Sequence, residues 1–115
     1  MICGIGTDIV QISRLKDTLI HKILTRKEIE LYNSFQSSDR KKEFYAGRFA
    51  AKEAIIKAIT SPELIVSFQD ITILPDIHGK PIVDCQKAKG VQLLLSISHE
   101  RDYAVAFCVC ETLNL

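Results

Sequence analysis

Hydrophobic residues recur with helical spacing between residues 43 and 59, in the segment EFYAGRFAAKEAIIKAI. Phe44, Ala51 and Ile55 fall on one side of a helix of this period, while the charged residues fall elsewhere. Small residues in the middle of the segment, including Gly47, would let another backbone approach closely. The pattern predicts a long helix with a buried side and a charged edge.

Two further helices are expected before the long one. Residues 11–23 carry apolar side chains at helical intervals and basic side chains between them, which predicts a basic amphipathic helix. Thr25 and Glu28 match a capping box, so a second helix should cover residues 26–35. A polar break then separates it from the long helix, whose N-cap should be Ser37 or Ser38.

Apolar runs bounded by turn residues predict strands in the rest of the chain. The expected strands are residues 1–10, 67–74, 82–85, 91–98 and 103–110. The last two runs are separated by a short polar link, which indicates an antiparallel hairpin with His99 at the end of the sheet. The order of one strand, helices and four strands predicts one α+β domain over residues 1–115, with a largely antiparallel sheet and helices on one face.

Composition and charge restrict the classes of protein to consider. A chain of 115 residues with 47% hydrophobic and 25% charged residues is typical of a globular domain, too small for a two-lobed cleft. A second copy is therefore expected to supply part of any site. The net charge of +1 argues against a surface devoted to nucleic acid. The four cysteines form no CxxC pair, so we expect buried free thiols and no zinc site.

The sequence also indicates a location. No apolar run reaches the roughly 18–20 residues that cross a membrane. The N-terminus lacks a basic region followed by a hydrophobic signal core. We therefore expect a cytoplasmic protein without a membrane partner.

Three charged residues stand out from these patterns. Asp8 lies in an apolar strand, where a carboxylate is costly to bury unless it is hydrogen-bonded, paired or bound to a metal; it could instead cap the following turn. Glu53 and Lys57 stand four residues apart on the long helix, a spacing that also fits an ordinary surface ion pair.

Two carboxylates from different elements, with cations beside them, suit a particular chemistry. Mg²⁺ prefers oxygen ligands, keeps several waters and is completed by the phosphates of a substrate. Asp8 and Glu53 would supply the oxygens, and Lys57, Lys52 and Arg48 would balance phosphate charge. This hypothesis requires that the strand and the helix meet in space.

Several segments of the chain together resemble holo-acyl-carrier-protein synthases. They are GIGTDIVQISR at residues 4–14, FYAGRFAAKEAIIKA at 44–58, SFQDI at 67–71, GKP at 79–81 and SISHERDYAVA at 96–106. The resemblance extends over nearly the whole chain. It implies an α+β homotrimer with active sites between neighbouring protomers. It also implies transfer of the 4′-phosphopantetheine arm of coenzyme A to a serine of apo acyl carrier protein. This reaction would release adenosine 3′,5′-bisphosphate and give holo acyl carrier protein for fatty acid synthesis.

The resemblance also implies roles for individual residues. Asp8 and Glu53 match the family's metal ligands, here for Mg²⁺, and Lys57 matches the lysine that contacts a coenzyme A phosphate. Arg48 and His99 match cleft positions expected to contact coenzyme A, with His99 also a candidate to handle a proton. The base that deprotonates the serine is either a side chain or a metal-ordered water.

The partner implied by the resemblance is an acidic acyl carrier protein. Arg14 matches the family's docking motif, and complementary charge would steer the encounter. The segment after Arg14 is a few residues shorter than in many members of the family. Lys16, Lys22 and Arg26 are therefore docking candidates from their charge alone.

Other functions remain to be weighed against this one. A broader phosphopantetheinyl transferase would serve other carrier domains. A non-catalytic relative that only binds coenzyme A should have lost a metal carboxylate, whereas Asp8 and Glu53 are both present. A nucleic-acid-binding domain would need aromatic pairs on a strand for base stacking, and the chain lacks them.

Overall fold

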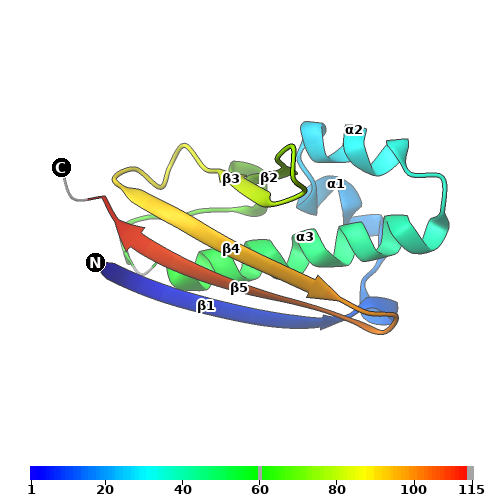
Figure 1. Cartoon of the computed structure of the whole chain (residues 1–115), viewed down its shortest axis with the longest axis horizontal. Coiled ribbons are helices and arrows are strands. Elements are labelled where there is room, and N and C mark those ends of the chain that lie inside the picture. The colour runs from blue at the N-terminus through cyan, green and yellow to red at the C-terminus, as the bar shows by residue number, and fades with distance from the viewer. Residues whose placement is uncertain (60, 114–115) are drawn as a thin grey trace.

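The strands form two antiparallel sheets in the computed structural model, which describes residues 1–59 and 61–113. The larger sheet has the order β1-β5-β4, and a two-stranded sheet pairs β2 with β3. Their bounds are Ile2–Gln11 for β1, Thr72–Pro75 for β2, Pro81–Asp84 for β3, Val91–His99 for β4 and Tyr103–Thr112 for β5. The predicted hairpin of the last two strands is confirmed (Figure 1).

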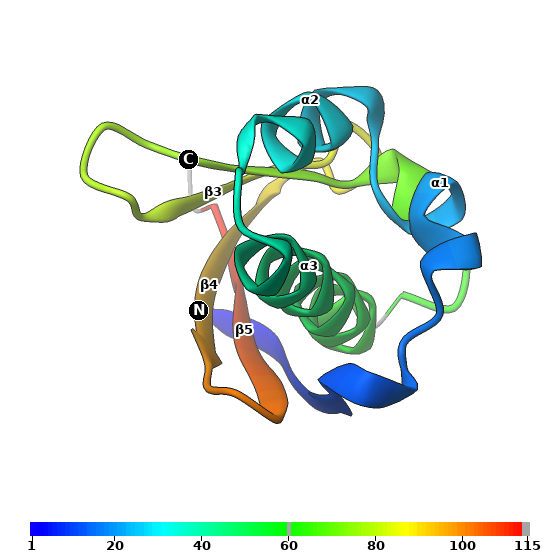
Figure 2. The ribbon, with the colours of Figure 1, turned by 90° about the vertical axis from the view of Figure 1, so that its right-hand side faces the viewer.

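The three α-helices lie on one side of the larger sheet. They are α1 (Ile20–Ile23), α2 (Arg26–Ser34) and α3 (Ser38–Ala58). Figure 2 shows α3 lying against the concave side of the curved sheet, with α1 and α2 on the side of α3 away from it. The predicted α+β class, with antiparallel pairing and helices on one face, is confirmed. Within the described residues, no helix has both the length and the apolar character to span a membrane.

The long helix α3 forms where its sequence pattern predicts. It begins after Ser37, whose hydroxyl accepts a hydrogen bond from the Arg40 backbone N–H, so Ser37 is the N-cap. Its predicted apolar side is buried, and small residues allow close packing. Those with no exposed surface include Ala50, Ala51, Ala54 and Ala58.

A single glycine sets how closely β1 approaches α3. A Cβ atom on Gly6 would lie 1.9 Å from the carbonyl oxygen of Ala54 and 2.9 Å from the Ala58 nitrogen. Only a residue without a side chain therefore fits between this strand and this helix. Side chains alternate along a strand, so Asp8 lies on the same face of β1 as Gly6 and is carried to the helix.

The predicted helix over residues 11–23 is wrong. The segment instead forms two 3₁₀ turns, Ile12–Arg14 and Asp17–Leu19, followed by the single turn of α1. The backbone is extended at Leu15 and Lys16, where the Lys16 carbonyl accepts a hydrogen bond from the Tyr45 hydroxyl at 2.7 Å. Packing against α3 thus overrides the helical period, and no continuous basic helix exists.

The predicted strand over residues 67–74 begins later than expected. Residues Phe68–Asp70 form a 3₁₀ turn, and β2 starts at Thr72. The Asp70 carboxylate accepts hydrogen bonds from the backbone and the hydroxyl of Ser67, which closes a capping box around the turn. Short polar side chains that bond to nearby backbone compete in this way with strand pairing.

The expectation of buried thiols is only partly met. Cys108 and Cys110 are buried, Cys85 is partly buried and Cys3 is exposed. The Cys3 sulfur lies 3.0 Å from that of Cys110 across the β1–β5 pairing. Within the described part of the chain the cysteines form no disulfide.

Candidate active site

Asp8, Glu53 and Lys57 converge where β1 crosses α3. The Lys57 Nζ atom lies 3.2 Å from an Asp8 carboxylate oxygen and donates a hydrogen bond to the Thr7 carbonyl at 3.0 Å. Burial raises the pKa of Glu53, the negative charge of Asp8 raises it further, and the positive charge of Lys57 opposes both. Two carboxylates are therefore held close enough to repel each other, with one ammonium group beside them.

This cluster has the donor chemistry of a magnesium site shared with a phosphate. The two carboxylates offer hard oxygen ligands, and their mutual repulsion favours a bound cation. Among residues 1–59 and 61–113, no group of three or more His, Cys, Asp or Glu side chains could enclose a metal ion. Mg²⁺ bound by one or two carboxylates typically keeps several waters and binds substrate phosphates.

The guanidinium of Arg48 is a second candidate cation for binding phosphate. Its Nε donates to the Ile73 carbonyl at 3.1 Å, and its guanidinium carbon lies 4.3 Å from the centre of the Phe44 ring. Burial lowers the pKa of Arg48 to about 10, so the group stays cationic at neutral pH. Among the described residues this is the only hydrogen bond that the guanidinium makes, which leaves its terminal NH₂ groups available to an anion.

Arg48 and His99 line the same pocket, which has a volume of about 300 Å³. His99 enters from the end of β4, and its Nδ1 lies 3.1 Å from a carboxylate oxygen of Glu43 on α3. Further walls come from α2 and from the β2–β3 hairpin, including Leu31, Pro75, Gly79 and Pro81. The pocket therefore joins basic and titratable groups from the helices and from both sheets.

The two groups of predicted residues lie on opposite sides of α3. Lys57 lies nine positions after Arg48, which is about two and a half helical turns. Lys57 therefore faces β1, while Arg48 faces the strand β2. Within one chain the structure assembles Asp8, Glu53 and Lys57, and separately Arg48 and His99, but it does not join the two groups.

Lys52 does not belong to the site, contrary to the sequence hypothesis. Its side chain has 0% exposure and its Nζ lies 2.5 Å from a Glu28 oxygen. It also donates to the carbonyls of Ile23 and Phe68. Burial lowers the pKa of Lys52, and Glu28 opposes that shift. The pair holds α1, α2 and α3 together.

Arg14 is exposed at the end of the first 3₁₀ turn. Lys16, Lys22 and Arg26 are exposed as well. The proposed docking residues thus remain accessible on the surface, although the helix expected to carry them is absent.

Sequence reasoning missed Glu43 and Arg40, which both line the pocket beside His99. Residues 40, 43, 44, 47 and 48 share one face of a helix, because the spacing follows the i, i+3, i+4, i+7, i+8 pattern. That face combines a glycine with three charged residues. This spacing is visible in the sequence. Its meaning depends on the end of the strand that carries His99, which the fold places opposite this face of the helix.

Comparison with known proteins shows the family of the chain. The model of the 4′-phosphopantetheinyl transferase superfamily matches residues 4–108. The chain belongs to this superfamily. A holo-acyl-carrier-protein synthase of Geobacillus sp. (strain WCH70) is 47% identical over 122 residues, which cover 99% of this chain and 100% of the relative.

Solved structures give the same result. The holo-acyl-carrier-protein synthase of Bacillus anthracis str. Ames in complex with CoA (3′,5′-ADP) has a TM-score of 0.88 and 40% identity, covering 98% of this chain and 99% of that one. The Helicobacter pylori enzyme in complex with coenzyme A has a TM-score of 0.77 and 30% identity, with coverage of 93% and 99%. The resemblance read from the sequence is confirmed.

Proposed function

We propose that this chain transfers the 4′-phosphopantetheine arm of coenzyme A to a serine of apo acyl carrier protein, releasing adenosine 3′,5′-bisphosphate. The observation that carries the proposal is the meeting of Asp8 and Glu53, from two distant segments, beside Lys57. The full-length likeness to holo-acyl-carrier-protein synthases, some solved with coenzyme A, supports the substrate. The proposal includes a cytoplasmic location, as expected from the sequence.

Asp8 and Glu53 would hold Mg²⁺ against the pyrophosphate of coenzyme A. When bound there, Mg²⁺ would act as a Lewis acid and stabilise the departing phosphate. The Lys57 ammonium group would donate to a phosphate oxygen and neutralise charge on the same group. The carrier serine oxygen would attack the phosphorus nearest the pantetheine, and the bond from that phosphorus to the bridging oxygen would break.

Arg48 and His99 would also bind coenzyme A, from the pocket that they line. The terminal NH₂ groups of Arg48 suit a phosphate, because a guanidinium can donate two parallel hydrogen bonds to its oxygens. These two side chains lie across α3 from Lys57. We therefore propose that they bind a coenzyme A molecule whose pyrophosphate is held by Asp8, Glu53 and Lys57 of a neighbouring copy. Positioning and charge neutralisation would then provide most of the rate enhancement.

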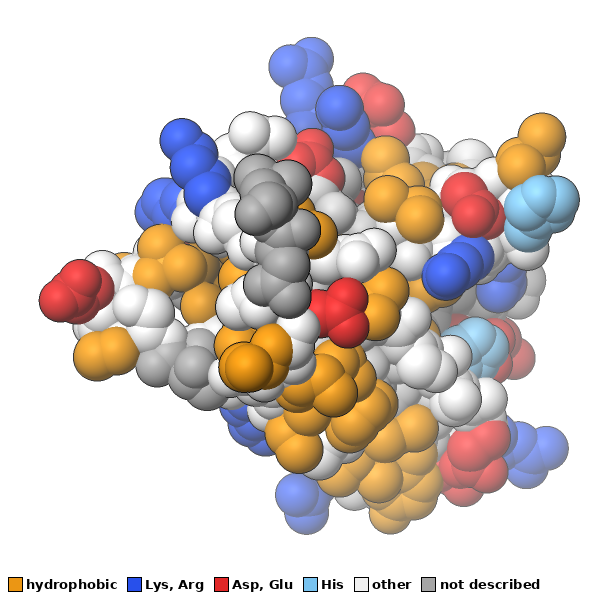
Figure 3. Space-filling view, turned by 60° about the vertical axis from the view of Figure 1, so that its left-hand side comes forward, with side chains coloured by type: hydrophobic (Ala, Val, Ile, Leu, Met, Phe, Trp, Pro, Cys, Tyr) orange, Lys and Arg blue, Asp and Glu red, His pale blue; other side chains and the backbone are white. Residues whose placement is uncertain are grey.

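The outer face of the larger sheet suits this assembly into a homotrimer. Its strands expose Ile5, Ile9 and Phe107 with 61%, 65% and 46% of their surface accessible. Val105, opposite Ile9, and Leu94, on the edge strand β4, are exposed as well. Figure 3 shows hydrophobic side chains gathered in the lower part of that view of the molecule. Large contiguous apolar areas are rare on monomers and mark association surfaces.

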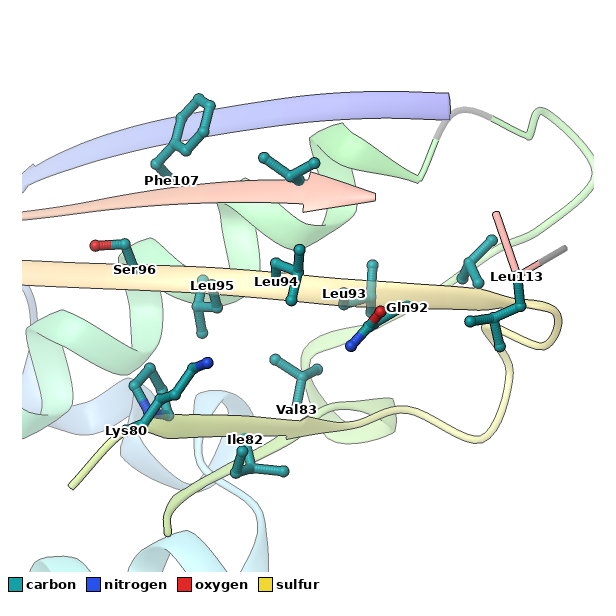
Figure 4. Close-up of a pocket in the computed structure, with 13 residues that line it drawn as sticks. Lys80, Ile82, Val83, Gln92, Leu93, Leu94, Leu95, Ser96, Phe107 and Leu113 are labelled. Atoms are coloured by element: carbon teal, nitrogen blue, oxygen red, sulfur yellow. The ribbon is translucent and has the colours of Figure 1, made fainter. Parts of the chain in front are cut away.

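An apolar groove between β3 and β4 extends this area. It has a volume of about 800 Å³, and Ile82, Val83, Leu93 and Leu95 contribute to its walls (Figure 4). The β4 strand forms the edge of the larger sheet and makes no ladder to β3. A second copy covering the groove would remove both the exposed edge and the apolar surface from water.

The acidic acyl carrier protein would dock near Arg14, at the end of β1 that also carries Asp8. Arg14 is exposed and needs no rearrangement to meet an acidic partner. Attraction between opposite charges raises the association rate and weakens as salt is added. By the same argument, docking of the carrier protein would also be favoured by the positive charges of Lys16, Lys22 and Arg26.

Mass spectrometry of the carrier protein tests the proposal. We expect the wild-type chain, with coenzyme A and Mg²⁺, to add one phosphopantetheine group to an apo acyl carrier protein. Omitting Mg²⁺ in the presence of a chelator should stop the reaction, and so should a carrier whose serine is replaced by alanine. A carrier domain of a secondary-metabolite synthase in a parallel arm measures the acceptor range. No mass change with the fatty-acid-type carrier would overturn the proposal.

A further inference from the structure

Glu43 contacts His99 in a geometry that constrains the imidazole ring. One carboxylate oxygen lies 3.1 Å from Nδ1, and both side chains keep about a third of their surface exposed, at 29% for Glu43 and 35% for His99. A carboxylate oxygen can only accept a hydrogen bond, so the proton of this contact belongs to Nδ1. The ring is therefore held with Nε2 as the nitrogen left for a ligand.

The surroundings of the Glu43–His99 pair fit a role in ligand binding more than a purely structural one. Glu43 and His99 come from α3 and from the last residue of β4, and they line the pocket that contains Arg48. Among the described residues, the imidazole ring of His99 makes no other hydrogen bond. A structural pair would be expected to hold the end of β4 in place, but β4 is already fixed by its register with β5, where His99 lies opposite Ala104.

We infer that Glu43 is a positioning residue for phosphopantetheine transfer, and that it orients His99 so that Nε2 faces coenzyme A. The inference rests on the proposed function, because it assigns to Glu43 the orientation of a side chain that would bind coenzyme A. The hydrogen bond at one ring nitrogen sets which tautomer the other presents. Without Glu43, the ring could rotate and exchange its proton between the two nitrogens.

Two substitutions separate the hydrogen bond from the charge. Glu43→Gln removes the negative charge but keeps an oxygen that accepts from Nδ1, whereas Glu43→Met removes both. Glu30→Met, at an exposed position of α2, is the matched control for loss of a surface carboxylate. We expect kcat/KM for coenzyme A to fall about 10-fold in Glu43→Met, to change much less in Glu43→Gln and to stay unchanged in Glu30→Met.

A double-mutant cycle shows whether Glu43 acts through His99. In the His99→Ala background, Glu43→Met should cause no further loss, because the ring it orients is gone. Nitrogen-15 NMR spectra at alkaline pH report the tautomer directly. The chain has three histidines, and the His99 signal is the one missing in His99→Ala. We expect a proton on Nδ1 in the wild type and in Glu43→Gln, and a shift toward the Nε2–H form in Glu43→Met.

The outcomes distinguish this inference from the proposed function. If the wild type transfers phosphopantetheine but Glu43→Met is fully active, or loses as much activity without His99 as with it, the positioning role is wrong and the function stands. An unchanged tautomer in Glu43→Met also overturns the role. If the wild type itself transfers nothing, the proposed function fails, whatever the NMR spectra show.

Discussion

The surroundings of Glu53 disfavour the ionised form of its carboxyl group. Burial and the charge of Asp8 raise its pKa above the ordinary value of 4.5, while Lys57 opposes them. The folded chain therefore holds a proton on Glu53 more tightly than the unfolded chain does. Ionisation then destabilises the fold above the raised pKa, and this cost is absent below the ordinary pKa, where Glu53 is protonated in both states.

Glu53→Gln should therefore stabilise the metal-free protein at neutral pH while reducing transfer by about 100-fold or more. The gain in melting temperature should disappear as the pH falls below 4.5, the ordinary pKa. Calorimetry in a chelator, over a series of pH values, measures the first effect, and Glu30→Gln is the control for an exposed carboxylate. A variant less stable than the wild type at pH ~7 would contradict the reasoning.

Among individual residues, the sequence predicted the meeting of Asp8, Glu53 and Lys57 but not the burial of Lys52. Asp8 stood out because a carboxylate in an apolar strand is costly, and the structure places it beside Glu53 and Lys57. Lys52 was misassigned because its burial depends on Glu28, whose sequence signal was that of a helix cap. Glu28 fills both roles: it accepts from the Thr25 N–H, and it pairs with Lys52.

Among the secondary-structure elements, the packing of β1 on α3 determines whether the carboxylates meet. Gly6→Ala places a methyl group 1.9 Å from the Ala54 carbonyl oxygen, and backbone cannot move aside as a side chain can. We expect a loss of about 1–3 kcal/mol or more in the free energy of unfolding. Since the strand must move away from the helix, transfer should fall as well.

Gly47→Ala is the matched comparison for Gly6→Ala. Its new Cβ would lie 3.2 Å from a methyl carbon of the Ile97 side chain, which can shift by a few tenths of an ångström. Alanine also favours the helix over glycine by up to about 1 kcal/mol. Denaturant unfolding of both variants should therefore show a much smaller change for Gly47→Ala. Equal losses would mean that the approach of β1 to Ala54 is not what constrains the fold.

The elements themselves were predictable where local signals and packing agree. The capping box at Thr25 and Glu28 and the hairpin of β4 and β5 are confirmed. The helix over residues 11–23 failed because its apolar residues pack in a hydrophobic cluster with Phe44 and Tyr45. Helical spacing identifies a buried side but not the path that the backbone takes to bury it.

For the molecule as a whole, α3 divides the predicted site into two halves. The half with Asp8, Glu53 and Lys57 faces β1, and the half with Arg48 and His99 faces β2 and the end of β4. The sequence alone could not show this division, because it follows from how both sheets surround the helix. A trimer with sites between protomers would pair one half from each of two copies.

Subunit mixing tests that arrangement. Glu53→Gln disables one half and Arg48→Ala the other, so each variant alone should be nearly inactive. Trimers assembled from an equal mixture should regain activity in about a quarter of their sites, where an intact half from each variant meets. Mixing Glu53→Gln with Asp8→Asn is the control, because both changes lie in the same half and no site can be repaired. Equal activity in the two mixtures would show that each chain uses both halves itself, and would exclude a site shared between copies.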